Sequence, residues 1–148
     1  MRIQECKEIE RWIIKYSNYS RKKRGISPFR TNWGLTKVAK NHSGRMARAQ
    51  KIWHGDGVHI AKENITYGKG FFGFIKSLFS NHSYSSSGEN VAMNSSKGSS
   101  KSIAKSFHIM WMKSPGHRAN ILNSNFSLIG VGVIKNKSGY YSTQLFYG

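Results

Sequence analysis

Apolar residues recur along the first third of the chain with the period of a helix. Over residues 3–17 they lie three or four positions apart with Lys and Glu between them, which predicts an amphipathic helix. This helix should end before the basic run at 21–24, because Gly25 and Pro28 follow as helix breakers. A second helix is expected from Asn32, a favourable N-cap, along a longer stripe with the same period. That stripe contains Leu35, Val38, Ala39, His42, Met46, Ala49 and Trp53.

The pattern in the last third of the chain alternates between strand and helix. Residues 89–93 form a short strand-like piece inside a serine-rich stretch, and residues 102–113 return to the helical period. Residues 127–147 are typical of two strands joined by a short loop at 136–139, which predicts a hairpin. The expected order is therefore helix, helix, short strand, helix and hairpin. This order favours an α+β domain in which helices cover an antiparallel sheet.

The middle of the chain, residues 55–88, is irregular apart from one apolar stretch. Residues 71–78 place four apolar side chains on one helical face, interrupted by Gly73. A short helix packed on the domain is expected here, because amphipathic faces of globular domains usually point inward. A lid or a segment that touches a membrane is the alternative.

Length and cysteine usage limit the architecture further. The 148 residues suit one domain, spanning 1–148, and no linker separates a second one. The single cysteine, Cys6, excludes an intramolecular disulfide and lies on the inward stripe of the first helix, where a buried thiol is expected. No apolar run approaches the about 20 residues that a membrane span needs. Because the first twelve residues also lack the apolar core of a signal peptide, we expect an intracellular protein or a mature or trimmed form.

The charge of the chain is strongly positive. There are 24 Lys and Arg against 6 Asp and Glu, which gives a net charge of +18. Such a charge attracts polyanions, whether nucleic acid, an anionic membrane or an anionic cell-wall polymer, without selecting among them. The alternative interpretation is a solvated basic surface with no dedicated partner.

The stretch WMKSPGHRANIL is the most informative local motif. Ser114 followed by Pro115 predicts that one helix ends and that another begins, with Ser114 as its N-cap. His117 then occupies the third helical position, where the positive end of the helix favours neutral imidazole. Neutral imidazole coordinates metal or accepts a proton. A nucleophile–base pair of Ser114 and His117 is not expected, because capping explains the serine and no G-x-S-x-G elbow is present.

Other histidines have a simpler interpretation. His42 falls on the apolar stripe of the second helix, where a hydrogen-bonded core residue is more common than a ligand. The remaining histidines outside any motif, His59, His82 and His108, are interpreted as ordinary surface or core residues.

Four motifs occur in order along the chain and together resemble a known family. They are LTKVAKNHSGRMA at 35–47, WHGDG at 53–57, GENVAM at 88–93 and WMKSPGHRANIL at 111–122, the last followed by FSLIGVGV and YYSTQLF. This set resembles the CAP superfamily, or SCP-domain proteins, and SPGHRANIL with IGVGV is similar to its bacterial and archaeal branch. The resemblance covers about residues 3–148. It implies a three-layer α–β–α sandwich with a small antiparallel sheet, which agrees with the element order above.

The resemblance also implies a cavity built from two histidines and usually two glutamates. Matched motif by motif, it implies His54 of WHGDG, Glu89 of GEN and His117 of SPGHR as cavity residues. In many eukaryotic members a second glutamate lies three residues after the helix tryptophan, Trp111 here, and this chain has Ser114 at that position. The departure leaves two imidazoles with a single carboxylate.

Residues next to these three are expected to support them. Gly88 and Asn90 are interpreted as shaping a turn around Glu89, through backbone freedom and side-chain-to-backbone bonding. Arg118, next to His117, can pair with an acid, meet an anionic ligand or remain exposed.

Two histidines and one acid leave several chemistries open. His54 and His117 can bind zinc or another divalent metal, with Glu89 as third ligand or behind one imidazole, or they can form an acid–base pair. In the structural alternative Glu89 only orients an imidazole and no metal is bound natively. A dedicated tight zinc site is not expected, because structural sites use four ligands and catalytic sites three. No cofactor is required by any of these interpretations.

The resemblance implies an extracellular or cell-surface protein but does not settle an activity, and we expect a binding domain and not an enzyme. Its cavity would take a small ligand of apolar or anionic character, and its basic exterior would hold it near an anionic membrane or cell wall. The alternative is a metal-assisted hydrolase, peptidase-like, that uses His54, Glu89 and His117 as catalytic candidates, and the missing second carboxylate argues against it. A nucleic-acid binder is suggested only by charge, since no RNA-binding signature is present.

Overall fold

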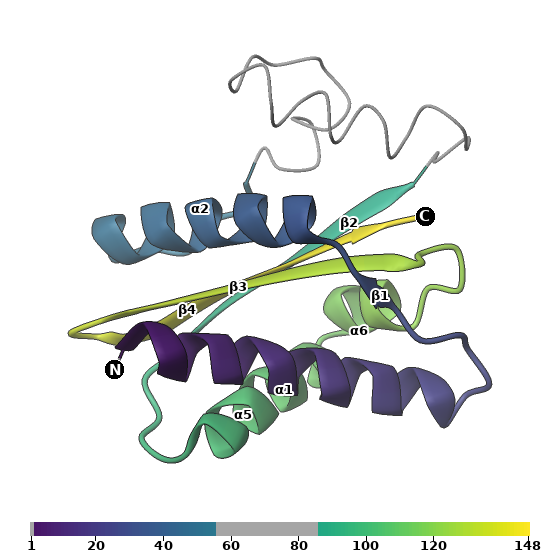
Figure 1. The fold of residues 1–148 in the computed structure, drawn as a ribbon, viewed down its shortest axis with the longest axis horizontal. Helices are drawn as coiled ribbons and strands as arrows, with labels where there is room; N and C mark the ends of the chain where they lie inside the picture. The colour runs from purple at the N-terminus through teal and green to yellow at the C-terminus, as the bar shows by residue number, and fades with distance from the viewer. Residues whose placement is uncertain (1, 56–85) are drawn as a thin grey trace.

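The computed structural model describes residues 2–55 and 86–148. The apolar stretch at 71–78, His59 and His82 therefore lie outside the described residues, and the predictions made for them stay predictions. The elements, in chain order, are α1 (Arg2–Lys22), β1 (Arg30–Thr31), α2 (Trp33–Ala49), β2 (Ser87–Asn94), α5 (Ser100–Lys113), α6 (Pro115–Ile121), β3 (Leu128–Asn136) and β4 (Gly139–Tyr147) (Figure 1).

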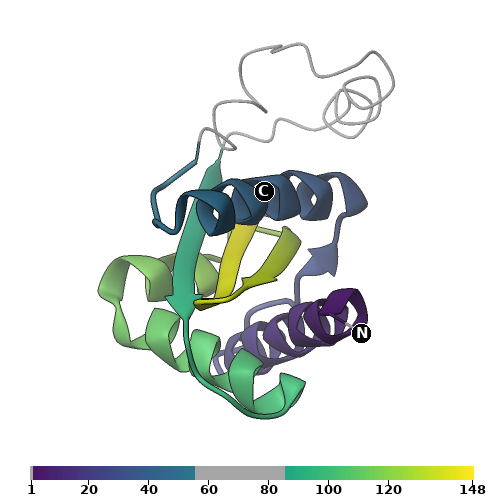
Figure 2. The ribbon, with the colours of Figure 1, turned by 90° about the vertical axis from the view of Figure 1, so that its left-hand side faces the viewer.

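These elements form three layers, with one sheet in the middle and helices on both of its faces. The strands lie in the order β1-β3-β4-β2, with α2 on one face and α1, α5 and α6 on the other (Figures 1 and 2). The α+β class and the α–β–α sandwich are confirmed. The sheet is mixed and not purely antiparallel, because β1 runs parallel to β3, with Arg30 opposite Leu128. This strand has two residues, too few to show a period of two in the sequence.

Most predicted elements are confirmed, with small differences at their ends. Asn32 caps α2 by accepting a hydrogen bond from the Leu35 backbone N–H at 2.9 Å. The helix ends at Ala49, so Trp53, expected on its stripe, lies beyond it. The hairpin forms as expected, with the side chain of Asn136 accepting hydrogen bonds from the backbone N–H groups within its turn.

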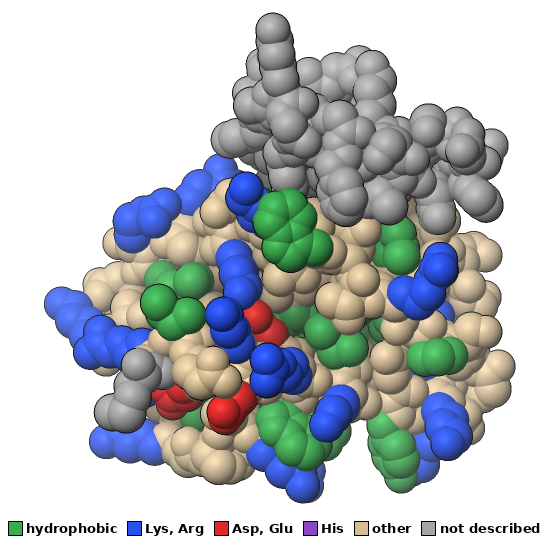
Figure 3. Space-filling model, viewed as in Figure 1, with side chains coloured by type: hydrophobic (Ala, Val, Ile, Leu, Met, Phe, Trp, Pro, Cys, Tyr) green, Lys and Arg blue, Asp and Glu red, His purple; other side chains and the backbone are tan. Residues whose placement is uncertain are grey.

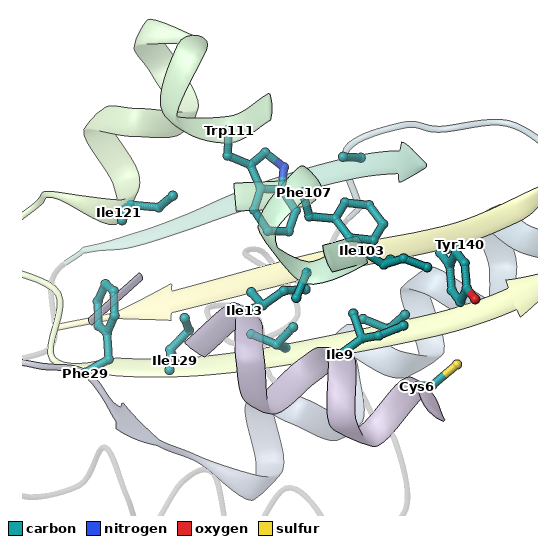
Figure 4. Close-up of a cluster of buried hydrophobic side chains, with 14 of the residues drawn as sticks. Cys6, Ile9, Ile13, Phe29, Ile103, Phe107, Trp111, Ile121, Ile129 and Tyr140 are labelled. Carbon is teal, nitrogen blue, oxygen red and sulfur yellow. The ribbon is translucent and has the colours of Figure 1, made fainter. Parts of the chain in front are cut away.

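The main core lies between the sheet and the layer of α1 and α5. Ile9 and Ile13 of α1 meet Phe107 and Trp111 of α5 there, and the indole of Trp111 donates to the Val91 carbonyl at 3.2 Å (Figure 4). Cys6 is buried in the same cluster, as expected. The core on the other face of the sheet is thinner. It is divided into two clusters: Leu35, Ala39, Leu128, Leu145 and Tyr147 form the first, with Val38 at its margin, and Met46, Ala47, Val91 and Tyr141 form the second.

The C-terminal end of α1 differs from the prediction for a physical reason. The helix continues through Lys22, because Arg21 points into the protein and is only 1% exposed. Its guanidinium donates to the carbonyls of Ser27, Ile121, Asn123 and Phe126 at 2.7–3.0 Å. The basic run is therefore not wholly a surface loop, and its first residue ties α1 to the end of α6.

His108 is a core residue that gives the fold a dependence on pH. Its Nε2 lies 2.8 Å from the Ser20 hydroxyl, and its ring stacks on Tyr16. Burial lowers the pKa of His108 to about 4. Because the unfolded chain binds this proton near pH 6.5, stability conferred by neutral His108 is lost as pH falls from about 6.5 to 4. The loss should reach about 3 kcal/mol.

This dependence is measurable against a variant that keeps the hydrogen bond. Urea unfolding of the wild type and of His108→Gln should be compared at pH 7 and at pH 4. The wild type should lose about 3 kcal/mol more than the variant between the two conditions. Equal losses in both proteins would show that His108 does not contribute to the pH dependence.

Candidate functional site

His54 lies in the short coil that follows α2, and two buried residues position it. His42, deep under this coil, places its Nε2 2.8 Å from the Trp53 carbonyl, and the two rings meet edge to face. A Cβ at Gly55 would lie 2.7 Å from the His42 ring, so the chain can pass there only with a glycine. His42 is thus the core residue that its position predicted, and it also supports the backbone on both sides of His54.

Glu89 lies on β2, the strand next to this coil, and its side chain is 4% exposed. Its Oε1 accepts the Gly55 backbone N–H at 2.8 Å and lies 3.1 Å from Nδ1 of His54. This contact favours the tautomer of His54 in which Nδ1 carries the proton and Nε2 has a free lone pair. Within the described part of the chain, Oε2 of Glu89 is buried without a hydrogen-bond partner.

His117 occupies the third position of α6, as the motif predicted, and its ring centroid lies 6.2 Å from that of His54. The ring is half-buried. Burial first, and then the neighbouring His54, lower the pKa of His117. The neutral form is favoured as expected, although the causes are burial and the second imidazole.

The strand predicted over 89–93 is confirmed and begins at Ser87, so the GEN motif lies within it and the turn expected from Gly88 and Asn90 does not form. Gly88, Glu89 and Asn90 all lie within β2 and pair with β4. Asn90 is fully buried, and its Nδ2 donates to the His117 carbonyl at 3.1 Å. The asparagine therefore links the strand that carries Glu89 to the helix that carries His117.

A buried network of amides extends this link. Asn120 of α6 donates to Oδ1 of Asn90 at 2.9 Å and to the Glu89 carbonyl at 3.2 Å. On its other side, Asn90 donates to Gln144 at 3.0 Å, which in turn donates to Ser17 of α1 at 3.1 Å. The paired amides fix α6 against β2, because breaking any one link would leave a buried polar group without a partner.

Ser114 begins α6 but does not act as the expected side-chain cap. Its carbonyl accepts the Arg118 backbone N–H at 2.8 Å, and its hydroxyl makes no capping hydrogen bond. The start of the helix is set by Pro115, which cannot continue α5. Arg118 is exposed.

Two further residues complete the surroundings of the carboxylate. Burial and the charge of Glu89 raise the pKa of Tyr147, so its phenol stays protonated near the site. A Cβ at Gly88 would lie 2.8 Å from the amide oxygen of Asn120, so glycine lets α6 approach β2. The roles of Tyr147 and Gly88 could not be predicted from the sequence, since both depend on contacts between elements that are far apart in the chain.

The site contains the imidazoles of His54 and His117, and the Glu89 carboxylate lies behind that of His54. Among the residues at 2–55 and 86–148, no three His, Cys, Asp or Glu side chains are grouped closely enough to hold a metal ion together. The described residues therefore do not form a closed structural metal site, which uses four ligands.

Comparison with known proteins decides the family. The profile of the cysteine-rich secretory protein family, CAP, matches residues 14–147. The chain belongs to the CAP family. It is also 34% identical over 139 residues to the uncharacterized protein YkwD of Bacillus subtilis, an alignment that covers 94% of this chain and 47% of YkwD. This CAP chain thus spans about half the length of the curated relative that it matches. Its single cysteine shows that the family name does not describe its composition.

Solved structures share the CAP fold with this chain. An extracellular protein with an SCP domain from Bacillus anthracis is 25% identical, with a TM-score of 0.61 over 93% of this chain and 39% of the other. An outer surface protein of Borrelia burgdorferi is 18% identical, with a TM-score of 0.68 over 95% of this chain and 92% of the other. Within the described ranges of the CAP chain, no helix has the length and apolar character for crossing a bilayer.

Proposed function

We propose that this CAP chain is an extracellular or surface-associated binding domain that holds a divalent metal ion, such as Zn²⁺, between His54 and His117. The observation that carries the proposal is the contact of 3.1 Å between Nδ1 of His54 and Oε1 of Glu89, with the His117 ring 6.2 Å from the His54 ring. The extracellular and outer-surface proteins that share its fold support the location.

Two imidazole nitrogens suit a metal ion that is neither hard nor soft, such as Zn²⁺, and with only two protein ligands the site should bind it with modest affinity. A carboxylate on one nitrogen of an imidazole orients the ring and raises the basicity of the other nitrogen, an arrangement common behind metal-ligating histidines. The lowered pKa of His117 keeps its imidazole neutral near pH 7, so protons compete weakly with a metal ion for this ring. His54 is 66% exposed and can adjust its ring toward the ion.

A site with two protein ligands leaves positions open for a further ligand. The Glu89 side chain lies behind His54, and its buried Oε2 is an acceptor without a partner among the described residues. A bound metal would supply a Lewis acid for an anionic group of a small ligand. A hydrolase would need a second base or a polarising group, and Ser114 at the position of the family's second glutamate supplies no carboxylate.

Calorimetric titration with Zn²⁺ tests this proposal. Wild type should bind one ion, and His54→Ala and His117→Ala should each abolish measurable binding. Glu89→Gln should weaken binding roughly 10- to 100-fold, because it removes the charge behind His54 and keeps the shape. His108→Gln provides the matched control, since His108 is buried between α5 and α1, where it contacts Ser20 and Tyr16.

Wild-type affinity in both alanine variants would refute the assignment of the metal to this pair. Hydrolysis of a peptide library by wild type, lost in Glu89→Gln, would instead support the hydrolase. Each variant should unfold cooperatively, so that a loss of binding is not a loss of fold.

A further inference from the structure

The positive charge of the described chain is barely neutralised by its own carboxylates. Residues 2–55 and 86–148 contain four acidic side chains, Glu5, Glu8, Glu10 and Glu89. Three of them lie within ion-pair distance of a basic side chain of these ranges: Glu5 contacts Lys135, Glu10 contacts Lys40 and Glu89 contacts His54. Most lysines and arginines of these ranges therefore have no carboxylate of the same ranges within ion-pair distance, and their charge is available to an external anion.

One face of the molecule combines these cations with aromatic side chains. From Arg11 onward α1 contains no acidic residue, and α5 contains none along its whole length. The two helices pack against each other, with Tyr16 of α1 stacked on His108 of α5. We call their outward surface the α1–α5 face, and it is formed by Trp12, Lys15, Tyr19, Lys101 and Lys105, together with Lys23 just beyond the end of α1.

The side chains of the α1–α5 face are ordered by contacts between cations and rings. The ammonium groups of Lys15 and Lys101 lie 4.5 and 4.7 Å from the centre of the Trp12 ring. Further along α1, Tyr19 is 59% exposed and has the Lys23 ammonium 5.0 Å from its ring. Figure 3 shows apolar and aromatic surface interleaved with Lys and Arg over α1, with acidic side chains gathered away from its C-terminal half.

We propose that the α1–α5 face docks on an anionic phospholipid surface. Lysines near a membrane gain from its negative potential, and Trp and Tyr prefer the headgroup region, where one end of the ring is apolar and the other is wet. Single-stranded nucleic acid needs open ring faces for stacking, whereas the Trp12 ring is already in contact with two ammonium groups. The proposal is independent of the metal site.

Cosedimentation with vesicles tests the α1–α5 face. The probes are vesicles of phosphatidylcholine alone, and of equal parts phosphatidylcholine and phosphatidylglycerol. Wild type should bind the anionic vesicles only, and less as salt rises. Lys15→Glu with Lys101→Glu should lower partitioning roughly thirtyfold or more, because each lysine near the surface contributes about fivefold. Tyr19→Ser should lower it several-fold without changing the charge.

A second pair of substitutions changes the net charge by the same amount outside the α1–α5 face, and so distinguishes an effect of this face from an effect of total charge. Arg48→Glu with Lys51→Glu alters exposed cations at the end of α2, on the opposite side of the sheet. This pair should change partitioning less than about threefold. Equal losses from the two pairs, or equal binding to both kinds of vesicle, would overturn the proposal.

Two further comparisons complete the design. If single-stranded DNA binds through Lys15 and Lys101 while anionic vesicles are not bound, the face recognises a polymer and the proposal is wrong. His54→Ala with His117→Ala should bind vesicles as wild type does. Failure of the metal proposal and failure of the membrane proposal are thereby distinguished.

Discussion

Replacing Gly132 with alanine should destabilise the protein by more than about 3 kcal/mol. Gly132 lies on β3 beneath α2, and a Cβ there would overlap the backbone of Ala39 and Lys40. Backbone cannot rotate aside as a side chain can, so the helix would have to move away from the sheet. That movement would open the thin core around Leu145 and separate Ser43 from the Gly132 carbonyl, to which it now donates at 2.9 Å.

Urea unfolding at pH 7 measures this effect, and Gly44→Ala is the matched control. Gly44 lies within α2, and its added methyl would meet only the end of the Arg48 side chain, at 3.6 Å. Because alanine favours a helix over glycine, the control should be neutral or stabilise by up to about 1 kcal/mol. A Gly132→Ala protein as stable as wild type would show that α2 does not pack this closely on β3.

Replacing Arg21 with methionine should cost about 3–5 kcal/mol. The change removes hydrogen bonds to the carbonyls of Ile121, Asn123 and Phe126, which are then left without these donors. It also removes the contact of the guanidinium with the Phe29 ring, at 3.7 Å from its centre. Methionine keeps the unbranched apolar stem of the side chain and carries no donors, so the loss reports mainly the missing hydrogen bonds.

The neighbouring residue provides the control for this substitution. Lys22 is exposed and lies on the same turn of α1, so Lys22→Met should change stability by less than about 0.5 kcal/mol. Arg21→Met should also raise proteolytic cleavage around α6, because α6 loses its link to α1. Equal unfolding free energies for the two variants would contradict the role assigned to Arg21.

Long stretches with one period were predictable from the sequence, whereas features that depend on contacts across elements were not. The helical stripe from Leu35 to Met46 and the hairpin around Asn136 repeat their pattern over many residues, so each residue supports the same prediction. Arg21 follows the helical period too, but a cation is expected at the surface unless its partners are known. Its partners are carbonyls about a hundred residues away in the chain.

In the candidate site, too, some residues were predictable from the sequence and others were not. His54, Glu89 and His117 were assigned by their motifs, because spacing along the chain gives no information on residues that only the fold brings together. The strand predicted over 89–93 is confirmed, whereas the turn expected from Gly88 and Asn90 does not form, because Asn90 satisfies a buried amide network within that strand. Support by His42 and Asn120 was not predictable, because neither contact leaves a pattern in the sequence.

The most direct test of the metal site is a crystal structure of the protein soaked with zinc, recorded at the zinc absorption edge. We expect one anomalous peak bonded to Nε2 of His54 and to a nitrogen of His117, at the usual zinc–nitrogen distance of about 2.0–2.1 Å. Oε1 of Glu89 should remain on Nδ1 of His54. Zinc bound elsewhere, with these two imidazoles free of metal, would contradict it.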